Sequence, residues 1–322
     1  MRLWPIGLIF SLAAPVAASD LVLDWPVDCT LGSDCHIQQY VDHDPSPATR
    51  DFTCNGLTYD GHKGTDIALP SLAEMRSGVS VLAAAGGVVA GARDSMADQY
   101  ATGENAAAVR GRECGNGVLI RHDGGWETQY CHMRRGSIAV SQGDRVEPGT
   151  ILGQVGLSGN TEFPHLHLTV RHNGKTIDPF IPSMTADCRT APDADALWRD
   201  DIPYEPGGFI ASGFSDHVPK FATIKEGTAD QAPLPAGASA LVYWAYAFGS
   251  RTGDRLQLDI TGPNGPVLQQ EDQLEKPQAQ LFRAAGRRIR GVGLQPGLYQ
   301  ATATLIRAGK IIDTAQRSML VE

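Results

Sequence analysis

The amino-acid sequence predicts an all-β protein with two domains. The chain has 322 residues, about twice the length of a typical domain, and its 42% hydrophobic content is enough to build folded cores. Short apolar runs separated by glycine-containing turns fill residues 59–182, and alternating apolar runs fill residues 209–322. We therefore expect a β-rich domain followed by an immunoglobulin-like β-sandwich.

Residues 1–19 are expected to be a cleaved secretory signal peptide. Arg2 precedes an apolar run over residues 3–16, and the run ends in the small residues Ala17, Ala18 and Ser19. A buried N-terminal helix is the alternative, which two prolines in the segment disfavour. The rest of the chain contains no apolar stretch of the ~20 residues that a membrane-spanning helix needs. We expect an exported protein, periplasmic or extracellular, without a membrane anchor after cleavage.

Cysteine content points to disulfides. An even number of cysteines in an exported chain favours pairing, and the six lie at positions 29, 35, 54, 114, 131 and 188. One pair can be predicted, because Cys114 and Cys131 flank two apolar runs joined by a turn at residues 123–125. Zinc held by thiolates is the competing use, and the absence of any C-x2-C pair disfavours it.

Two segments read as connections rather than as core elements. Residues 20–58 carry three cysteines and a polar stretch, which is typical of an arm supported by disulfides. Residues 183–208 contain three prolines and suit a linker between the domains.

Residues 93–113 are too long for a plain connection, so they are either a lid or specificity loop, or a tolerated surface insertion with a short helix.

The C-terminal domain carries two recognisable patterns. The segment 294–299 resembles the tyrosine corner of β-sandwiches, in which the hydroxyl of Tyr299 would bond to nearby backbone. Four aromatic residues could form a binding platform for carbohydrate or protein, or could fill the sandwich core, which we favour: Tyr243, Trp244, Tyr246 and Phe248.

The charge balance excludes one class of partner. Lys and Arg number 27 against 36 Asp and Glu, which leaves a formal charge of −9, and no long basic tract is present. Nucleic acid is therefore not an expected partner, because phosphate binding depends on clustered cations.

Histidines in the first domain suggest a metal site. His165 and His167 lie two residues apart in a predicted strand, so both imidazoles share one face. The same parity along residues 126–132 would align His132 with Tyr130, while Cys131 points to the other face. Gly64 permits a bend that brings His62 and Asp66 to one ion. Two imidazoles and a carboxylate make a three-ligand catalytic zinc set that leaves one position for water.

The order of these motifs closely resembles the lysostaphin-type zinc endopeptidases, the LytM-domain or β-lytic metallopeptidase family. The matching segments are His62-Lys63-Gly64-Thr65-Asp66, Gly115 to His122 leading to Thr128-x-Tyr130-x-His132, and Gly156 to Asn160 leading to Pro164-His165-Leu166-His167. The resemblance implies a β-rich domain with an open catalytic groove, Zn²⁺ bound by His62, Asp66 and His167, and catalysis by His132 and His165. The departures are Phe163, where glycine is frequent, and the 93–113 insertion.

The resemblance also implies the function. We expect an exported zinc endopeptidase that hydrolyses peptide cross-bridges of peptidoglycan with a zinc-activated water and histidine acid–base assistance. A Gly-Gly-directed protease acting on glycine-rich peptides and a non-catalytic adaptor of cell-wall hydrolases are the alternatives. Tyr130 is a candidate for substrate binding, with ordinary packing as the favoured interpretation. The other five histidines, at positions 36, 43, 122, 172 and 217, receive no role, and four of them (36, 43, 172 and 217) are expected to be solvated.

Overall fold

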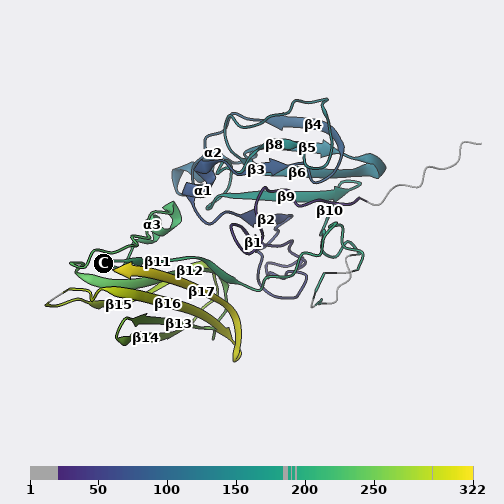
Figure 1. Ribbon diagram of the computed structural model, residues 1–322. Coiled ribbons are helices and arrows are strands. Elements are labelled where there is room, and N and C mark those ends of the chain that lie inside the picture. The colour runs from purple at the N-terminus through teal and green to yellow at the C-terminus, as the bar shows by residue number, and fades with distance from the viewer. Residues whose placement is uncertain (1–20, 184–187, 190, 193, 292, 322) are drawn as a thin grey trace, which may run out of the picture.

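The computed structural model describes residues 21–183, 188–189, 191–192, 194–291 and 293–321, and shows two β-rich parts connected by the chain (Figure 1). The predicted signal peptide lies outside these residues. Within the described ranges, no helix combines the length and the apolar character needed to cross a membrane.

An eight-stranded sheet organises the first part. Its neighbours are antiparallel, and in spatial order the strands are β1 (His36–Gln39), β2 (Thr65–Ala68), β9 (His165–His172), β6 (Trp126–Met133), β5 (Asn116–Arg121), β4 (Gly87–Arg93) and β7 (Arg145–Val146), with β10 (Lys175–Ile177) paired to β9. A second, two-stranded sheet contains β3 (Ser80–Leu82) and β8 (Ile151–Gln154).

Short helices connect these strands. Helix α1 (Leu72–Ser77) begins at Ser71, whose hydroxyl accepts hydrogen bonds from two backbone amides, and ends at Gly78 in the left-handed conformation. Helix α2 (Glu104–Ala108) lies in the 93–113 insertion, and a single 3-10 turn, η1 (Asp123–Gly125), joins β5 to β6. The insertion also pairs with the segment before β9, because Gln99 and Ala101 donate backbone hydrogen bonds to Leu157 and Thr161.

The segment expected to be an arm is part of the core of the first domain. Leu23, Ile37, Tyr40 and Phe52 are almost completely buried. From the segment expected to be a linker, the side chains of Leu197, Trp198 and Ile202 are buried in the same cluster. The expectation of an arm outside the core was therefore wrong: the polar stretch and the cysteines suggested an arm, but burial of the large apolar side chains of this segment outweighs its polar composition.

Three disulfides use all six cysteines. The predicted pair Cys114–Cys131 is present, and the other two are Cys29–Cys35 and Cys54–Cys188. The pair Cys54–Cys188 joins positions 134 residues apart and links the N-terminal segment to the segment that follows the eight-stranded sheet.

The second part is a β-sandwich. One sheet has three strands, β11 (Gly208–Ser215), β12 (Ala240–Ser250) and β15 (Gln278–Arg288), and the other has four, β14 (Gly265–Gln273), β13 (Arg255–Gly262), β16 (Gly297–Arg307) and β17 (Lys310–Val321). The predicted tyrosine corner is confirmed, because the hydroxyl of Tyr299 donates to the carbonyl of Gln295 at 3.1 Å. All four candidate platform aromatics are buried, but only Tyr243 lies in the sandwich core; Trp244 and Tyr246 pack in a separate cluster with Ile224, and Phe248 packs in the core of the first part.

The two parts are in contact through several interactions. Helix α3 (Phe221–Glu226), between β11 and β12, lies beside α1 of the first domain (Figure 1). The guanidinium of Arg76 pairs with the carboxylate of Glu226. Gln38 on β1 donates to the carbonyl of Ala279 at 2.9 Å, and the ring of His36 packs on Phe248 with centroids 4.4 Å apart. This contact brings the sandwich to the histidine-bearing edge of β2 and β9.

Candidate active site

Antiparallel pairing of β2 with β9 assembles the centre of the site. The register places Asp66 directly opposite His167, so both side chains stand on the same face of the sheet. The apolar residues Leu166 and Leu168 of β9 alternate with the histidines and are completely buried on the other face. The prediction that His165 and His167 lie on one face of this strand is therefore confirmed.

His62 reaches the same point from the loop before β2. Its Nε2 atom lies 3.1 Å from the Oδ1 of Asp66 and 3.1 Å from the Nδ1 of His167, and the last two atoms are 2.7 Å apart. Gly64 makes this approach possible, because a Cβ at position 64 would lie 2.6 Å from the His167 ring.

Each ring has a hydrogen-bond partner on its outer side, and for His62 this partner identifies the tautomer. The Nδ1 of His62 lies 2.6 Å from the carbonyl of Tyr40, which can only accept, so the proton is on Nδ1 and Nε2 carries a lone pair. The Nε2 of His167 lies 3.0 Å from the Thr169 hydroxyl, which can accept a hydrogen bond from the ring and so suits the tautomer with a lone pair on Nδ1. Two imidazole nitrogens and a carboxylate oxygen thus converge on one point, and these are the donor types that fit a divalent cation such as zinc.

Burial and charge tune these groups. Burial alone would raise the pKa of Asp66, but the charges of His62 and His165 and hydrogen bonds from His165 and His167 hold it well below its usual range. Burial would likewise lower the pKa of His62, and the neighbouring Asp66 carboxylate reverses this and raises it. The pKa of His167 is lowered, mainly by burial. Asp66 is therefore an anion at neutral pH, as a metal ligand must be.

His132 reaches the site by a different route from the predicted one. Tyr130 pairs with Leu168 and Cys131 pairs with His167, so Tyr130 faces the core and Cys131 faces the site. Strict alternation would send His132 into the core as well. Its backbone has a φ of 62°, in the left-handed region, and the β5–β6 register shifts next to it, which turns the side chain to the site face.

The assignment of Tyr130 to substrate binding is corrected by this geometry. Its side chain is completely buried, and its hydroxyl accepts a hydrogen bond from the amide of Ala84 at 2.8 Å. The predicted alternation was wrong at this point because a period of two holds only along an uninterrupted strand, and β6 is interrupted at His132.

His132 and His165 present matching nitrogens to the site. The Nδ1 of His132 donates to the carbonyl of Ser158 at 2.8 Å, and the Nδ1 of His165 donates to the carbonyl of Phe163 at 2.9 Å. Both Nε2 atoms are therefore acceptors, and that of His165 lies 3.5 Å from Asp66. Burial, together with the charges of His165 and His167, lowers the pKa of His132 well below its usual value. A neutral imidazole with a free lone pair can accept a proton from a bound molecule.

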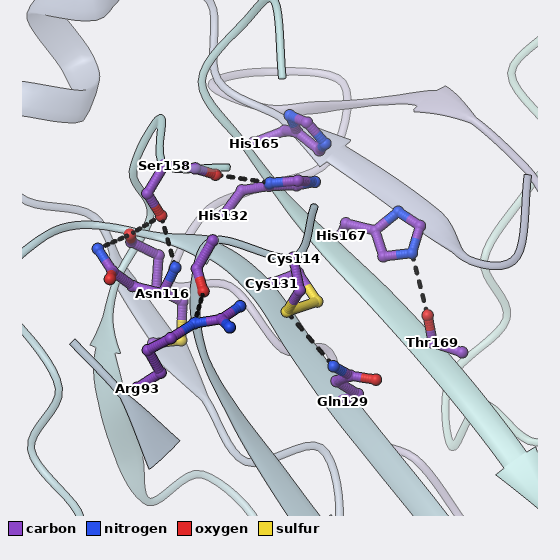
Figure 2. Close-up of a disulfide and its surroundings, with 12 residues drawn as sticks. Arg93, Cys114, Asn116, Gln129, Cys131, His132, Ser158, His165, His167 and Thr169 are labelled. Atoms are coloured by element: carbon purple, nitrogen blue, oxygen red, sulfur yellow. Dashed lines mark hydrogen bonds between the residues drawn. A yellow bond between two sulfur atoms is a disulfide. The ribbon is translucent and has the colours of Figure 1, made fainter. Parts of the chain in front are cut away.

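A disulfide and a serine hold His132 in place. Figure 2 shows the Cys114–Cys131 bond beside the three histidines of the sheet. The amide of His132 donates to the carbonyl of Cys114 at 2.8 Å, and the hydroxyl of Ser158 bridges the backbone between the amide of Asn116 and the carbonyl of Met133. The role of Ser158 was not predicted, although it lies in a glycine-rich segment that the sequence singled out.

The site opens into a cavity of about 470 Å³ that has two walls. Asp66, His132, Phe163 and His165 line the first wall, and the second comes from the sandwich domain, which supplies Phe221, Lys225 and Gln280. Sequence reasoning did not find the second wall, because no local pattern links residues so far along the chain to the histidines.

Two histidines without a predicted role are not solvated. His36 is buried against Phe248, and the Nε2 of His43 forms a hydrogen bond with the buried carboxylate of Asp178 at 2.7 Å. His217 is exposed, as expected, and His172 stacks on Trp126. The expectation of solvated rings was wrong for His36 and His43 for the same reason, because both belong to the N-terminal segment that packs into the core.

Comparison with known proteins agrees with the site. Residues 60–179 match Peptidase family M23. The chain is 33% identical over 124 residues to the DD-carboxypeptidase/endopeptidase Mpg of Neisseria meningitidis, an alignment that covers 38% of this chain and 23% of that protein. It is 33% identical over 144 residues to the peptidoglycan DD-endopeptidase ShyC of Vibrio cholerae, covering 43% and 28% of the two chains. The chain thus spans about a quarter of the length of these relatives.

Solved structures give matches of the same kind. The catalytic domain of the prophage-encoded M23 protein EnpA of Enterococcus faecalis aligns with a TM-score of 0.32 and 24% identity, over 47% of this chain and 92% of that one. A zinc-containing peptidase of Vibrio cholerae aligns with a TM-score of 0.31 and 23% identity, over 53% and 41% of the two chains.

Proposed function

Residues 60–179 form a domain of peptidase family M23, and from this premise we propose that the protein is an exported zinc endopeptidase that hydrolyses peptide cross-bridges of peptidoglycan. One observation carries the proposal. The Nε2 of His62, the Oδ1 of Asp66 and the Nδ1 of His167 converge within 3.1 Å of one another. Two of the relatives are named as DD-endopeptidases, which supports the choice of substrate.

His62, Asp66 and His167 are the residues that would hold zinc. When bound, the metal lowers the pKa of a water molecule and polarises the carbonyl of the scissile bond. A second group of possible ligands, His132, His165 and His167, lies in the same place. We assign the metal to the first group because it contains the buried carboxylate of Asp66.

His132 and His165 then serve as proton carriers. Each imidazole is oriented by a hydrogen bond from Nδ1 to a backbone carbonyl, so its Nε2 faces the cavity as an acceptor. Either ring can take the proton of the attacking water and return it to the leaving amine, a contribution worth roughly 10²–10⁴ in rate. The restraint of His132 by the disulfide and by Ser158 keeps this nitrogen in position before substrate arrives.

Export is supported by the cysteines. All six are paired, and such complete pairing is typical of proteins that fold outside the reducing cytoplasm. The apolar segment at residues 3–16 supports the same assignment.

Metal analysis combined with kinetics tests the proposal. We expect His62→Ala and His167→Ala to lose zinc and activity on purified sacculi together, whereas His132→Ala keeps zinc and loses turnover by about 10²-fold or more. His217→Ala, which changes an exposed ring, serves as the matched control and should behave as the unmodified protein. A His167→Ala protein with full activity would refute the proposal.

Parallel digests separate the substrate classes. Release of cross-bridge fragments from sacculi, abolished by a chelator, is the expected result. Cleavage of a pentaglycine peptide alone would instead assign a Gly-Gly-directed protease. A protein with full zinc occupancy that cleaves neither substrate would have to be an adaptor of other hydrolases.

A further inference from the structure

We propose that the β-sandwich domain supplies a carboxylate-binding subsite to the cavity, with the ammonium group of Lys225 as its cation. The inference rests on the proposed peptidase function and deepens it, because it names the substrate class. The preferred peptide carries a free carboxylate beside the scissile bond, and an oligoglycine bridge carries none.

The position of Lys225 is the first observation. It lies on α3 of the sandwich and lines the same cavity as Asp66, His132 and His165. Among the residues that line this cavity in the described part of the chain, Lys225 is the only lysine or arginine. A peptide held between the two walls therefore meets the histidines on one side and this single ammonium group on the other.

The ammonium group is held in place but keeps donors to spare. Its Nζ donates to the carbonyl of Glu162 at 2.8 Å and lies 4.6 Å from the centre of the Tyr100 ring. Across the described ranges, no carboxylate oxygen lies within 4.0 Å of this nitrogen. An ammonium carries three N–H donors, so two remain for a ligand.

Contacts between the domains fix α3 against the first wall. Arg76 on α1 pairs with Glu226, the residue next to Lys225. Gly227, which ends α3, approaches Ser71 so closely that a Cβ there would lie 2.5 Å from the hydroxyl oxygen. Tyr100, which supports Lys225, belongs to the 93–113 insertion. The insertion and the sandwich domain thus meet at this lysine.

Charge complementarity indicates the ligand. Asp66 is already engaged by His62 and His167, and Glu162 contributes the other carboxylate of the cavity wall. A substrate carboxylate gains a charge-assisted hydrogen bond from Lys225, which a carboxamide or a glycine cannot form with the same strength. A D-alanyl–diaminopimelate cross-bridge places such a carboxylate on the carbon attached to the scissile nitrogen, whereas pentaglycine has only uncharged amides at this position.

A matched pair of peptides tests the subsite. One is a D-alanyl–meso-diaminopimelate peptide with this carboxylate free, and the other carries a carboxamide in its place. Their dissociation constants are measured by calorimetry on the zinc-loaded full chain carrying His132→Ala, and kcat/KM is measured on the same chain without that change. We expect the free carboxylate to bind about tenfold more tightly than the carboxamide.

Substitutions locate the source of this preference. Lys225→Gln keeps a donor for the Glu162 carbonyl but should bring the affinity ratio of the two peptides close to one, with unchanged affinity for the carboxamide. Lys220→Gln, at the exposed start of the same helix, is the matched control and should keep the ratio. Glu162→Gln should increase the ratio, because a neighbouring negative charge is removed.

The outcomes separate this inference from the proposed function. Equal loss of affinity for both peptides in Lys225→Gln would overturn the subsite, since the lysine would then be only structural. Equal affinity of the two peptides for the protein that retains Lys225 would overturn the subsite as well. If neither peptide is cleaved but the preference for carboxylate is present and depends on Lys225, the proposed function fails and the subsite stands.

Discussion

Replacing Gly64 with alanine should remove zinc without touching a ligand. A Cβ at position 64 would lie 2.6 Å from the Nε2 of His167 and 2.6 Å from the carbonyl oxygen of Leu168. Ordinary contacts of a Cβ begin at 3.4 Å, so the neighbours must retreat by about 0.8 Å. The carbonyl belongs to β9 and is held by the sheet, whereas the His167 ring can rotate away.

The size of this displacement determines the expected effect. Metal–ligand distances tolerate only about 0.2 Å of error, so a ring moved by several times that amount no longer completes the site. We expect the zinc affinity of Gly64→Ala to fall by about 100-fold or more. Overpacking between β2 and β9 should also lower the free energy of unfolding by about 1–3 kcal/mol.

Zinc competition with a chromophoric chelator measures the affinity, and chemical denaturation measures the stability. Gly91→Ala is the control, because nothing lies within 4 Å of a Cβ at that position in the same sheet. Wild-type zinc affinity in a folded Gly64→Ala protein would show that His167 is not held against this backbone, and the assignment of the ligands would have to be abandoned.

Two further perturbations probe the disulfide and the buried histidine. Replacing both Cys114 and Cys131 with serine removes a link between residues 17 positions apart, so the free energy of unfolding should fall by about 3 kcal/mol in thermal unfolding. Turnover should also fall while zinc is retained, because His132 loses its restraint. An unchanged kcat would contradict this. The pKa of His36 is lowered to about 4 by burial, so the unfolded chain binds the proton first as the pH falls below 6.5 and stability decreases. Between pH 7 and pH 5 His36 should account for a loss of about 2 kcal/mol in urea titrations. His36→Gln should therefore lose about 2 kcal/mol less than the unsubstituted protein over this range, and His217→Gln should lose the same amount as the unsubstituted protein; an equal loss in His36→Gln and the unsubstituted protein would contradict the prediction.

Local sequence patterns were sufficient where one strand or one turn determines the geometry. The spacing of His165 and His167 placed both imidazoles on one face of β9, and the structure has them there. The Cys114–Cys131 pair followed from a hairpin between the two residues, and the Tyr299 hydrogen bond followed from a short motif. Each of these depends on interactions within one strand, turn or hairpin, so the order of residue types was enough.

Other features depend on the backbone of a single residue or on contacts between distant segments. The left-handed backbone of His132 turns its side chain to the site face, while Tyr130 stays in the core. No periodic pattern of residues in the sequence predicts this backbone conformation. The second wall of the cavity, with Lys225, exists only because α3 packs against α1 across two domains. The sequence alone thus determined which residues could bind a metal and carry protons, because chemistry and strand period are local. Tertiary structure decided what surrounds them, because packing free energy depends on surfaces that meet only in the folded chain.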